Sequence, residues 1–112
     1  MSKRAKILSS LLGRLEMAKG SDRPLDAVIE EELRGRTGKA PAYTGSIDQC
    51  LELLHDILPN WHWHIGRDAS GVFPYVTLSK GQTTARANGV TVPLVLLTAI
   101  IKALIEQEHK PT

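Results

Sequence analysis

The sequence predicts a mixed α/β fold of the α+β type, an α-β-α sandwich. Its antiparallel sheet of two or three strands would be covered by an N-terminal helical hairpin and two further helices. Apolar residues recur with a helical period in residues 3–33 and 47–58, whereas residues 61–65 alternate strictly. The chain's 112 residues fit one domain, residues 1–112, with a hairpin over 1–35 and a helix-hairpin-helix core over 43–109.

Two helices are expected in the first 35 residues. The first should run from about residue 3 to 18 and end at Gly20. Asp22 as a cap and Pro24 in the first turn mark the start of the second, which should end at Gly35. The apolar positions of the two helices are Leu8, Leu11, Leu12, Leu15, Leu25, Val28, Ile29 and Leu33. Because each helix is apolar on one side only, the pair must cover another part of the molecule.

A third helix should begin after Ser46, which forms a capping box with Gln49. Apolar residues at three- and four-residue steps predict its buried side, and Pro59-Asn60 ends it. Three carboxylates follow one another at four-residue steps on its other side: Asp48, Glu52 and Asp56. This spacing indicates a solvated helix face rather than the carboxylate pair of a glycosidase.

The next segment has the two-residue period of a β-hairpin. Trp61, Trp63 and Ile65 share one face, and His62 and His64 share the other. The second strand, residues 72–78, is apolar on both faces, which predicts a sheet covered on both sides. We therefore expect both indoles to anchor the core and both histidines to lie half-buried beneath the helical hairpin.

Two further features concern the sheet and the last helix. Pro74 lacks an amide donor and predicts an edge position or a bulge, and residues 83–88 are a candidate third strand. The last helix should begin near Thr91 with Pro93 in its first turn. It is apolar almost all round from 94 to 105, which is typical of a helix packed between other elements. The apolar stretch is too short to span a bilayer.

Composition narrows the class of protein. The formal net charge of +2 is too weak to indicate a nucleic-acid-binding protein by itself. A single cysteine, Cys50, fits a reducing cytoplasm. His55 lies on a different helix face from Cys50, so we interpret Cys50 as a small buried residue rather than a nucleophile. The clustered charges give candidate partner-binding residues: Lys3, Arg4, Lys6, Arg34, Arg36, Lys39, Glu30 and Glu31.

No cofactor, metal or catalytic residue is expected. His62 and His64 resemble half of a zinc site, with His55 or Asp68 as further candidate ligands, but a third placed ligand is missing from the pattern. The Gly38-Lys39 pair lacks the earlier glycine, the following Ser or Thr and the preceding strand of a phosphate-binding loop.

The order of these segments resembles the phage ABA sandwich domain family. The resemblance extends over nearly the whole chain, and the segments that carry it are residues 11–16, 22–27, 41–48, the strand introduced by Trp61 and Trp63, and 91–97. It implies a small bacteriophage or prophage protein with a sheet between helical layers. The family has no fixed catalytic set to carry over, and the two histidines are not part of its pattern.

From this resemblance and the lack of catalytic motifs we expect a non-enzymatic phage accessory protein that binds a host or phage protein in the bacterial cytoplasm. Inhibition of a host defence system such as CRISPR is one role that fits. One alternative is nucleic-acid binding through the basic first helix and residues 34–39. Another is a small metal-binding protein or enzyme that uses His62 and His64. A free sheet edge would also permit a homodimer.

Overall fold

The protein consists of a three-stranded antiparallel sheet stacked against α-helices, in a computed structural model that describes residues 2–109. The helices are α1 (Lys3–Met17), α2 (Arg23–Arg34), α3 (Ile47–Ile57) and α4 (Val92–His109), with a short 3-10 helix η1 (Tyr43–Gly45). The strands β1 (His62–Arg67), β2 (Pro74–Lys80) and β3 (Thr83–Asn88) pair in the order β1-β2-β3. The predicted mixed α+β class, with four helices and a small antiparallel sheet, and the third strand are confirmed.

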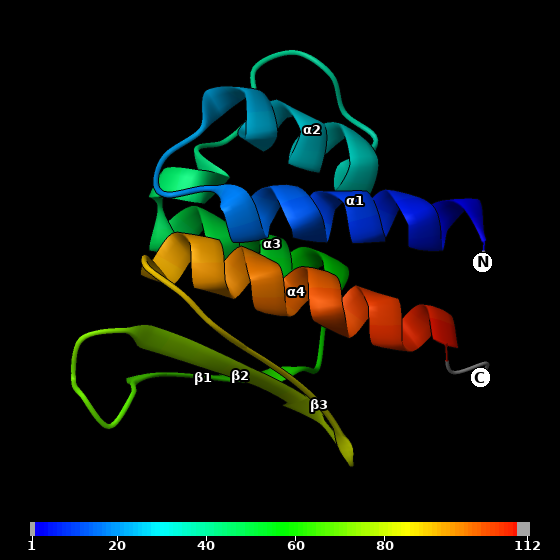
Figure 1. Cartoon of the computed structure of the whole chain (residues 1–112). Helices are drawn as coiled ribbons and strands as arrows, with labels where there is room; N and C mark the ends of the chain where they lie inside the picture. Colours follow the sequence, from blue (N-terminus) through cyan, green and yellow to red (C-terminus); the bar gives the residue numbers. More distant parts are fainter. Residues whose placement is uncertain (1, 110–112) are drawn as a thin grey trace.

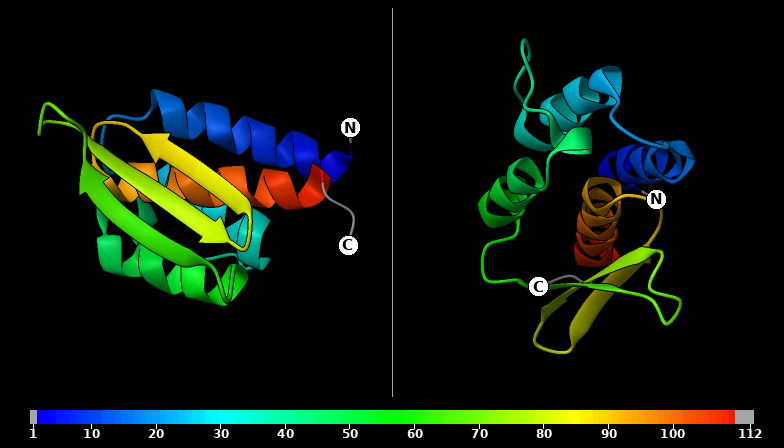
Figure 2. Two further views of the ribbon diagram at one scale, coloured as in Figure 1. Left: turned by 90° about the horizontal axis from the view of Figure 1, so that it is seen from below. Right: turned by 90° about the vertical axis from the view of Figure 1, so that its left-hand side faces the viewer.

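The helices lie on one face of the sheet (Figure 1). Helix α4 packs against β2 and β3, α1 and α3 flank α4, and α2 lies over them beside η1 (Figure 2). The view from below in Figure 2 shows the opposite face of the sheet with no helix in front of it. The prediction of a sheet covered on both sides is therefore wrong. The prediction failed because it counted Val72 and Phe73 as strand residues, which made the strand seem apolar on both faces. In the structure these two residues lie in the turn before β2 and are exposed.

Helices α2 and α3 start at the predicted caps, and α1 is capped in the same way by Ser2. Ser2, Asp22 and Ser46 each accept a hydrogen bond through the side chain from the backbone N–H three residues on. Gly35 ends α2 in the left-handed conformation, with φ of 69°. These local signals place α2 and α3 within a residue or two of the predicted bounds.

Helix α4 forms the centre of the core. It buries ten residues between Leu94 and Leu104, including the Thr98 hydroxyl, which donates to the Leu94 carbonyl at 2.7 Å. The inner face of the sheet adds Val76, Leu78, Ala85 and Ala87. Across residues 2–109, no helix combines the length and the apolarity that crossing a membrane requires.

Two residues of the hairpin differ from expectation. Trp61 is buried just before β1, but Trp63 remains 51% exposed, because β1 is an edge strand and Trp63 lies at the margin of the helical layer. Only Trp61 is a core anchor. Pro74 is the first residue of the central strand rather than part of an edge strand or bulge, and at that position the ladder loses no interior hydrogen bond.

Candidate functional site

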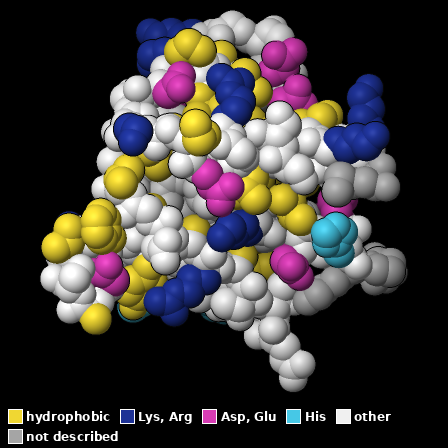
Figure 3. Space-filling view, viewed as in Figure 1, with side chains coloured by type: hydrophobic (Ala, Val, Ile, Leu, Met, Phe, Trp, Pro, Cys, Tyr) yellow, Lys and Arg dark blue, Asp and Glu magenta, His cyan; other side chains and the backbone are white. Residues whose placement is uncertain are grey.

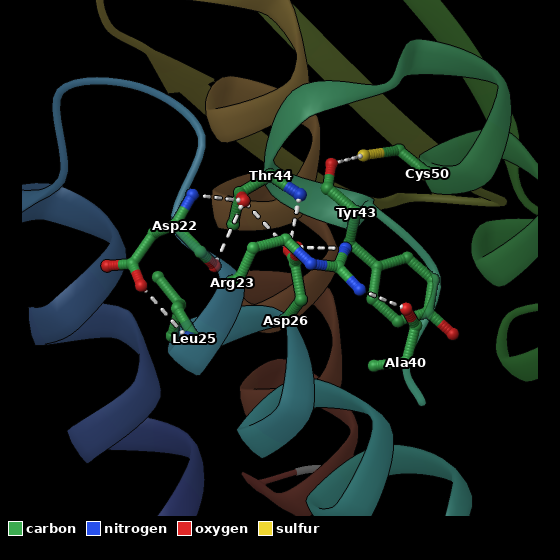
Figure 4. Close-up of polar contacts among 8 residues, drawn as sticks. All are labelled: Asp22, Arg23, Leu25, Asp26, Ala40, Tyr43, Thr44 and Cys50. Carbon is green, nitrogen blue, oxygen red and sulfur yellow. Dashed lines mark hydrogen bonds and ion pairs between the residues drawn. The ribbon is translucent and has the colours of Figure 1, made fainter. Parts of the chain in front are cut away.

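A buried polar cluster joins the start of α2 to η1 (Figure 4). The Asp26 carboxylate is fully buried, and its Oδ1 accepts hydrogen bonds from the Thr44 backbone N–H and hydroxyl, each at 2.7 Å. Its Oδ2 accepts from the Arg23 guanidinium at 2.8 Å. Three polar groups of the same fold satisfy this buried charge, so the role of the cluster is to hold α2 and η1 together.

A second cluster occupies the other end of α2. The Tyr43 hydroxyl donates to the Glu30 carboxylate at 2.6 Å and accepts from Arg34 at 3.2 Å. Arg34 Nε also lies 3.3 Å from the carboxylate of Asp56 on α3. Burial and then the hydrogen bond to Glu30 raise the pKa of Tyr43 to about 12. Glu30 and Arg34 were predicted as partner-binding residues, but they contact each other inside the fold, and Glu30 is buried.

Cys50 lies in the core beside these clusters. Its Sγ donates to the Tyr43 carbonyl at 3.0 Å. Burial, with a further contribution from the charge of Asp26, raises the pKa of the thiol to about 12. The thiol therefore stays protonated at neutral pH, and the interpretation of Cys50 as a small buried residue is confirmed.

The remaining predicted partner-binding residues are exposed. Lys3, Arg4 and Lys6 lie along α1, Glu31 lies on α2, and Arg36 and Lys39 lie in the loop that follows α2. Lys and Arg are interspersed with Asp and Glu on the side of the molecule shown in Figure 3. The three carboxylates of α3, Asp48, Glu52 and Asp56, are exposed as predicted. The use of the exposed charges as a docking surface stays a prediction.

The two histidines do not lie beneath a helical hairpin. His62 and His64 are exposed on the outer face of the sheet, the face that the helices leave uncovered. His55 belongs to α3, on the other side of the sheet, and Asp68 lies in the turn after β1. In the part of the chain that the structure describes, no three His, Cys, Asp or Glu side chains converge as metal ligands would.

The outer face of the sheet is polar, and Arg86 is its single Lys or Arg residue. The strand register arranges its residues in three rows across the sheet: His62, Ser79 and Thr84; His64, Thr77 and Arg86; Gly66, Tyr75 and Asn88. The three strands contain no Asp or Glu, and of their three cations Arg86 belongs to these rows, whereas Arg67 and Lys80 lie in the alternating rows. We define the nine residues of these rows as the outer face.

A stacked group forms the centre of the outer face. A Cβ atom at Gly66 would come within 2.7 Å of the Tyr75 ring, so the ring lies directly over the glycine of the neighbouring strand. The Arg86 guanidinium carbon lies 4.5 Å from the centroid of the same ring. His64 Nε2 is 3.1 Å from the Tyr75 hydroxyl. Stacking thus orders the Arg86 side chain, and within residues 2–109 its guanidinium has no hydrogen-bond or ion-pair partner.

The backbone beneath Arg86 is also held. Lys102 of α4 donates through Nζ to the Arg86 carbonyl at 3.1 Å, which joins the edge strand β3 to the helical layer. Sequence reasoning missed Tyr75, Gly66 and Arg86 as a group. A signal was present in residues 84–88, where polar Thr84, Arg86 and Asn88 alternate with Ala85 and Ala87, the pattern of a strand with one covered and one exposed face.

Comparison with known proteins identifies no relative of this chain. The chain matches no family model, no curated protein and no solved structure. The resemblance to the phage ABA sandwich domain stays a prediction, and the candidate site rests on the residues of this chain.

Proposed function

We propose that this protein is a non-enzymatic accessory protein that binds a macromolecule through the outer face of its sheet. The observation that supports this most is the stack of Gly66, Tyr75 and Arg86. An arginine on a sheet face that contacts only solvent gains nothing from being held in one orientation, whereas the Arg86 guanidinium is held over the Tyr75 ring. An ordered Arg with free N–H donors has lost part of its conformational entropy before a partner arrives, which favours tight binding of an anionic group.

The buried titratable groups support binding rather than catalysis. The Cys50 thiol has a pKa raised to about 12, so a thiolate nucleophile is not formed at neutral pH. The carboxylates of Asp26 and Glu30 accept hydrogen bonds from Thr44, Arg23 and Tyr43 inside the fold. These groups are engaged in structure, and they face neither the outer face nor one another across an open cleft.

The phage origin is a separate part of the proposal. It is supported by the residue pattern of segments 11–16, 41–48 and 91–97, which resembles the phage ABA sandwich domain. Binding to a host defence system stays a prediction.

Site-specific photo-crosslinking tests the proposed surface. A photoreactive residue is placed at Thr77, in the middle row of the outer face, or at Thr37, in the exposed loop after α2. Both variants are expressed in bacteria, irradiated and analysed by denaturing gel with protease and nuclease treatment. We expect a discrete macromolecular adduct from position 77 only. Adducts from position 37 alone, or from neither position, would contradict the proposal.

A further inference from the structure

The outer face lacks the apolar centre that a protein interface needs. None of its nine residues has an aliphatic side chain. They are two His, one Tyr, one Arg, one Asn, one Ser, two Thr and Gly66. The core of a protein–protein interface is enriched in apolar residues that exclude water around its main contacts. A protein partner would therefore find hydrogen-bonding groups but little apolar area on this face.

The same face offers flat groups on which a nucleobase can stack. His62 and His64 are exposed rings two residues apart on β1, and this places them about 7 Å apart along the strand. The Arg86 guanidinium lies over the Tyr75 ring, and Arg86 is exposed. Imidazole rings and guanidinium planes are groups on which unstacked bases of RNA and single-stranded DNA lie.

Hydrogen-bonding groups lie between these flat groups. Thr77 sits between His64 and Arg86 in the middle row, and Ser79, Thr84 and Asn88 occupy the neighbouring rows. Hydroxyl and amide groups can both donate to and accept from the edges of bases. The face thus combines stacking planes with adaptable polar contacts.

Charge on the sheet is complementary to phosphate. The outer face contains Arg86 and no carboxylate, and Asp68 in the turn after β1 accepts hydrogen bonds from its own turn, including one from the Ser70 hydroxyl. A phosphodiester chain that crosses the outer face therefore meets the Arg86 guanidinium and no acidic side chain among the nine residues of that face. With one such cation on the face, we expect a modest dependence of the affinity on salt concentration.

From these features we infer that the outer face binds single-stranded nucleic acid, with bases stacked on His62, His64 and Arg86. This inference rests on the proposed function and names the partner class of the same surface. A duplex is a poorer fit, because its bases are stacked on one another and are not offered to a flat sheet. The candidate surface also differs from the basic first helix, which the sequence alone indicated for nucleic acid.

The test is fluorescence anisotropy with fluorescein-labelled 15-nucleotide oligothymidylate, 15-nucleotide oligouridylate and a 15-base-pair duplex at low salt. The full chain is compared with Arg86→Ala, Arg86→Lys and Arg36→Ala, where Arg36 is an exposed cation in the loop after α2. A double variant, Lys3→Ala with Lys6→Ala, tests the first helix. Circular dichroism confirms that each variant is folded, which is expected because all four side chains are exposed.

We expect binding of at least one single strand in preference to the duplex. Arg86→Ala should weaken it about tenfold, and Arg86→Lys should recover only part of this loss, because an ammonium group keeps the charge but not the plane. Arg36→Ala should change affinity less than about twofold.

Absence of binding to both single strands at low salt would overturn the inference, as would equal affinity of Arg86→Ala and the unaltered chain. Loss of binding only in the Lys3 and Lys6 double variant would move the site to α1 and overturn it as well. If the crosslinking adduct at position 77 is a protein and neither oligonucleotide binds, the proposed binding function stands and this inference fails.

Discussion

Two polar regions of this molecule use similar side chains in opposite ways. At the junction of α2 and η1, the buried carboxylate of Asp26 is satisfied by Thr44 and by the half-exposed guanidinium of Arg23. On the outer face of the sheet, Arg86 is stacked on Tyr75 but its N–H donors meet no partner among the described residues. The polar groups of the first region bond to one another, and we call it the closed region. The Arg86 donors of the second region remain available to a partner, and we call it the open region.

The difference shows why charge in a sequence does not locate a binding surface. Asp26, Glu30 and Arg34 look like parts of a charged helix surface, but tertiary structure places them against η1 and α3. Arg86 is one isolated cation in a polar strand, yet the strand register places it over Tyr75 at the centre of a face. The partners of a charge decide its role, and these partners are distant in sequence.

The largest expected effect is at the closed region. Asp26→Ala removes the acceptor of the Thr44 N–H and hydroxyl and leaves a buried donor unsatisfied, so we expect a loss of about 2–4 kcal/mol in the free energy of unfolding. Urea denaturation measures it. Glu52→Ala, at an exposed carboxylate of α3, is the control and should change stability by less than about 0.5 kcal/mol. Equal effects of the two variants would show that the buried cluster does not hold the fold.

Alkaline pH should weaken the same region. The pKa values of Cys50 and Tyr43 are raised to about 12 from ordinary values of 9.0 and 10.0, so both groups ionise more easily in the unfolded chain. Their contribution to stability is therefore complete below about pH 9 and is lost as the pH rises toward 12. Urea denaturation at a series of pH values should show this decline. Cys50→Ala should make it shallower, and an unchanged slope in that variant would contradict the assigned burial of the thiol.

A smaller effect is expected at the open region when its geometry is disturbed. Gly66→Ala forces a methyl group to within 2.7 Å of the Tyr75 ring, which must move away from β1. We expect a destabilisation of about 1–3 kcal/mol and changed NMR shifts of the Tyr75 ring protons. Gly13→Ala is the matched control, because nothing lies within 4 Å of the added methyl group. Replacing glycine with alanine at an exposed helix position should raise the free energy of unfolding by about 0.5–1 kcal/mol. Unperturbed Tyr75 shifts in Gly66→Ala would show that the ring is not held over the glycine.

The smallest effect on stability is expected for the histidines. His62→Ala and His64→Ala remove exposed side chains from the outer face, so each should change the free energy of unfolding by less than about 0.5 kcal/mol. Thermal or urea denaturation at pH 7 measures it. A loss of several kcal/mol in the free energy of unfolding would contradict this. It would mean that the outer face is covered, as the prediction of a sheet covered on both sides required.

Much of the fold could be predicted because its signals are local. The caps at Asp22 and Ser46, the apolar period of α3 and the uniformly apolar α4 each depend on residues within one or two turns. The number of helical layers could not be predicted in this way. Val72 and Phe73 have strand-like composition but lie in a turn, and this one boundary decided whether the sheet seemed covered on one side or two.

The candidate site was less predictable for a related reason. The alternation in residues 61–65 correctly placed His62 and His64 together on one face. The stack on Tyr75, in contrast, requires the register of all three strands, since Gly66, Tyr75 and Arg86 come from β1, β2 and β3. A period shows which residues share a face of one strand, but not which residue of the next strand lies beside them.

The most direct test of the open outer face is a heteronuclear NMR titration of the ¹⁵N-labelled chain with the 15-nucleotide oligouridylate and oligothymidylate. We predict that amide shifts change first in β1, β2 and β3, around His64, Thr77 and Arg86, and that those of α2 and the loop over residues 35–41 stay constant. Changes confined to α1 or to that loop, with the strands unaffected, would contradict the account.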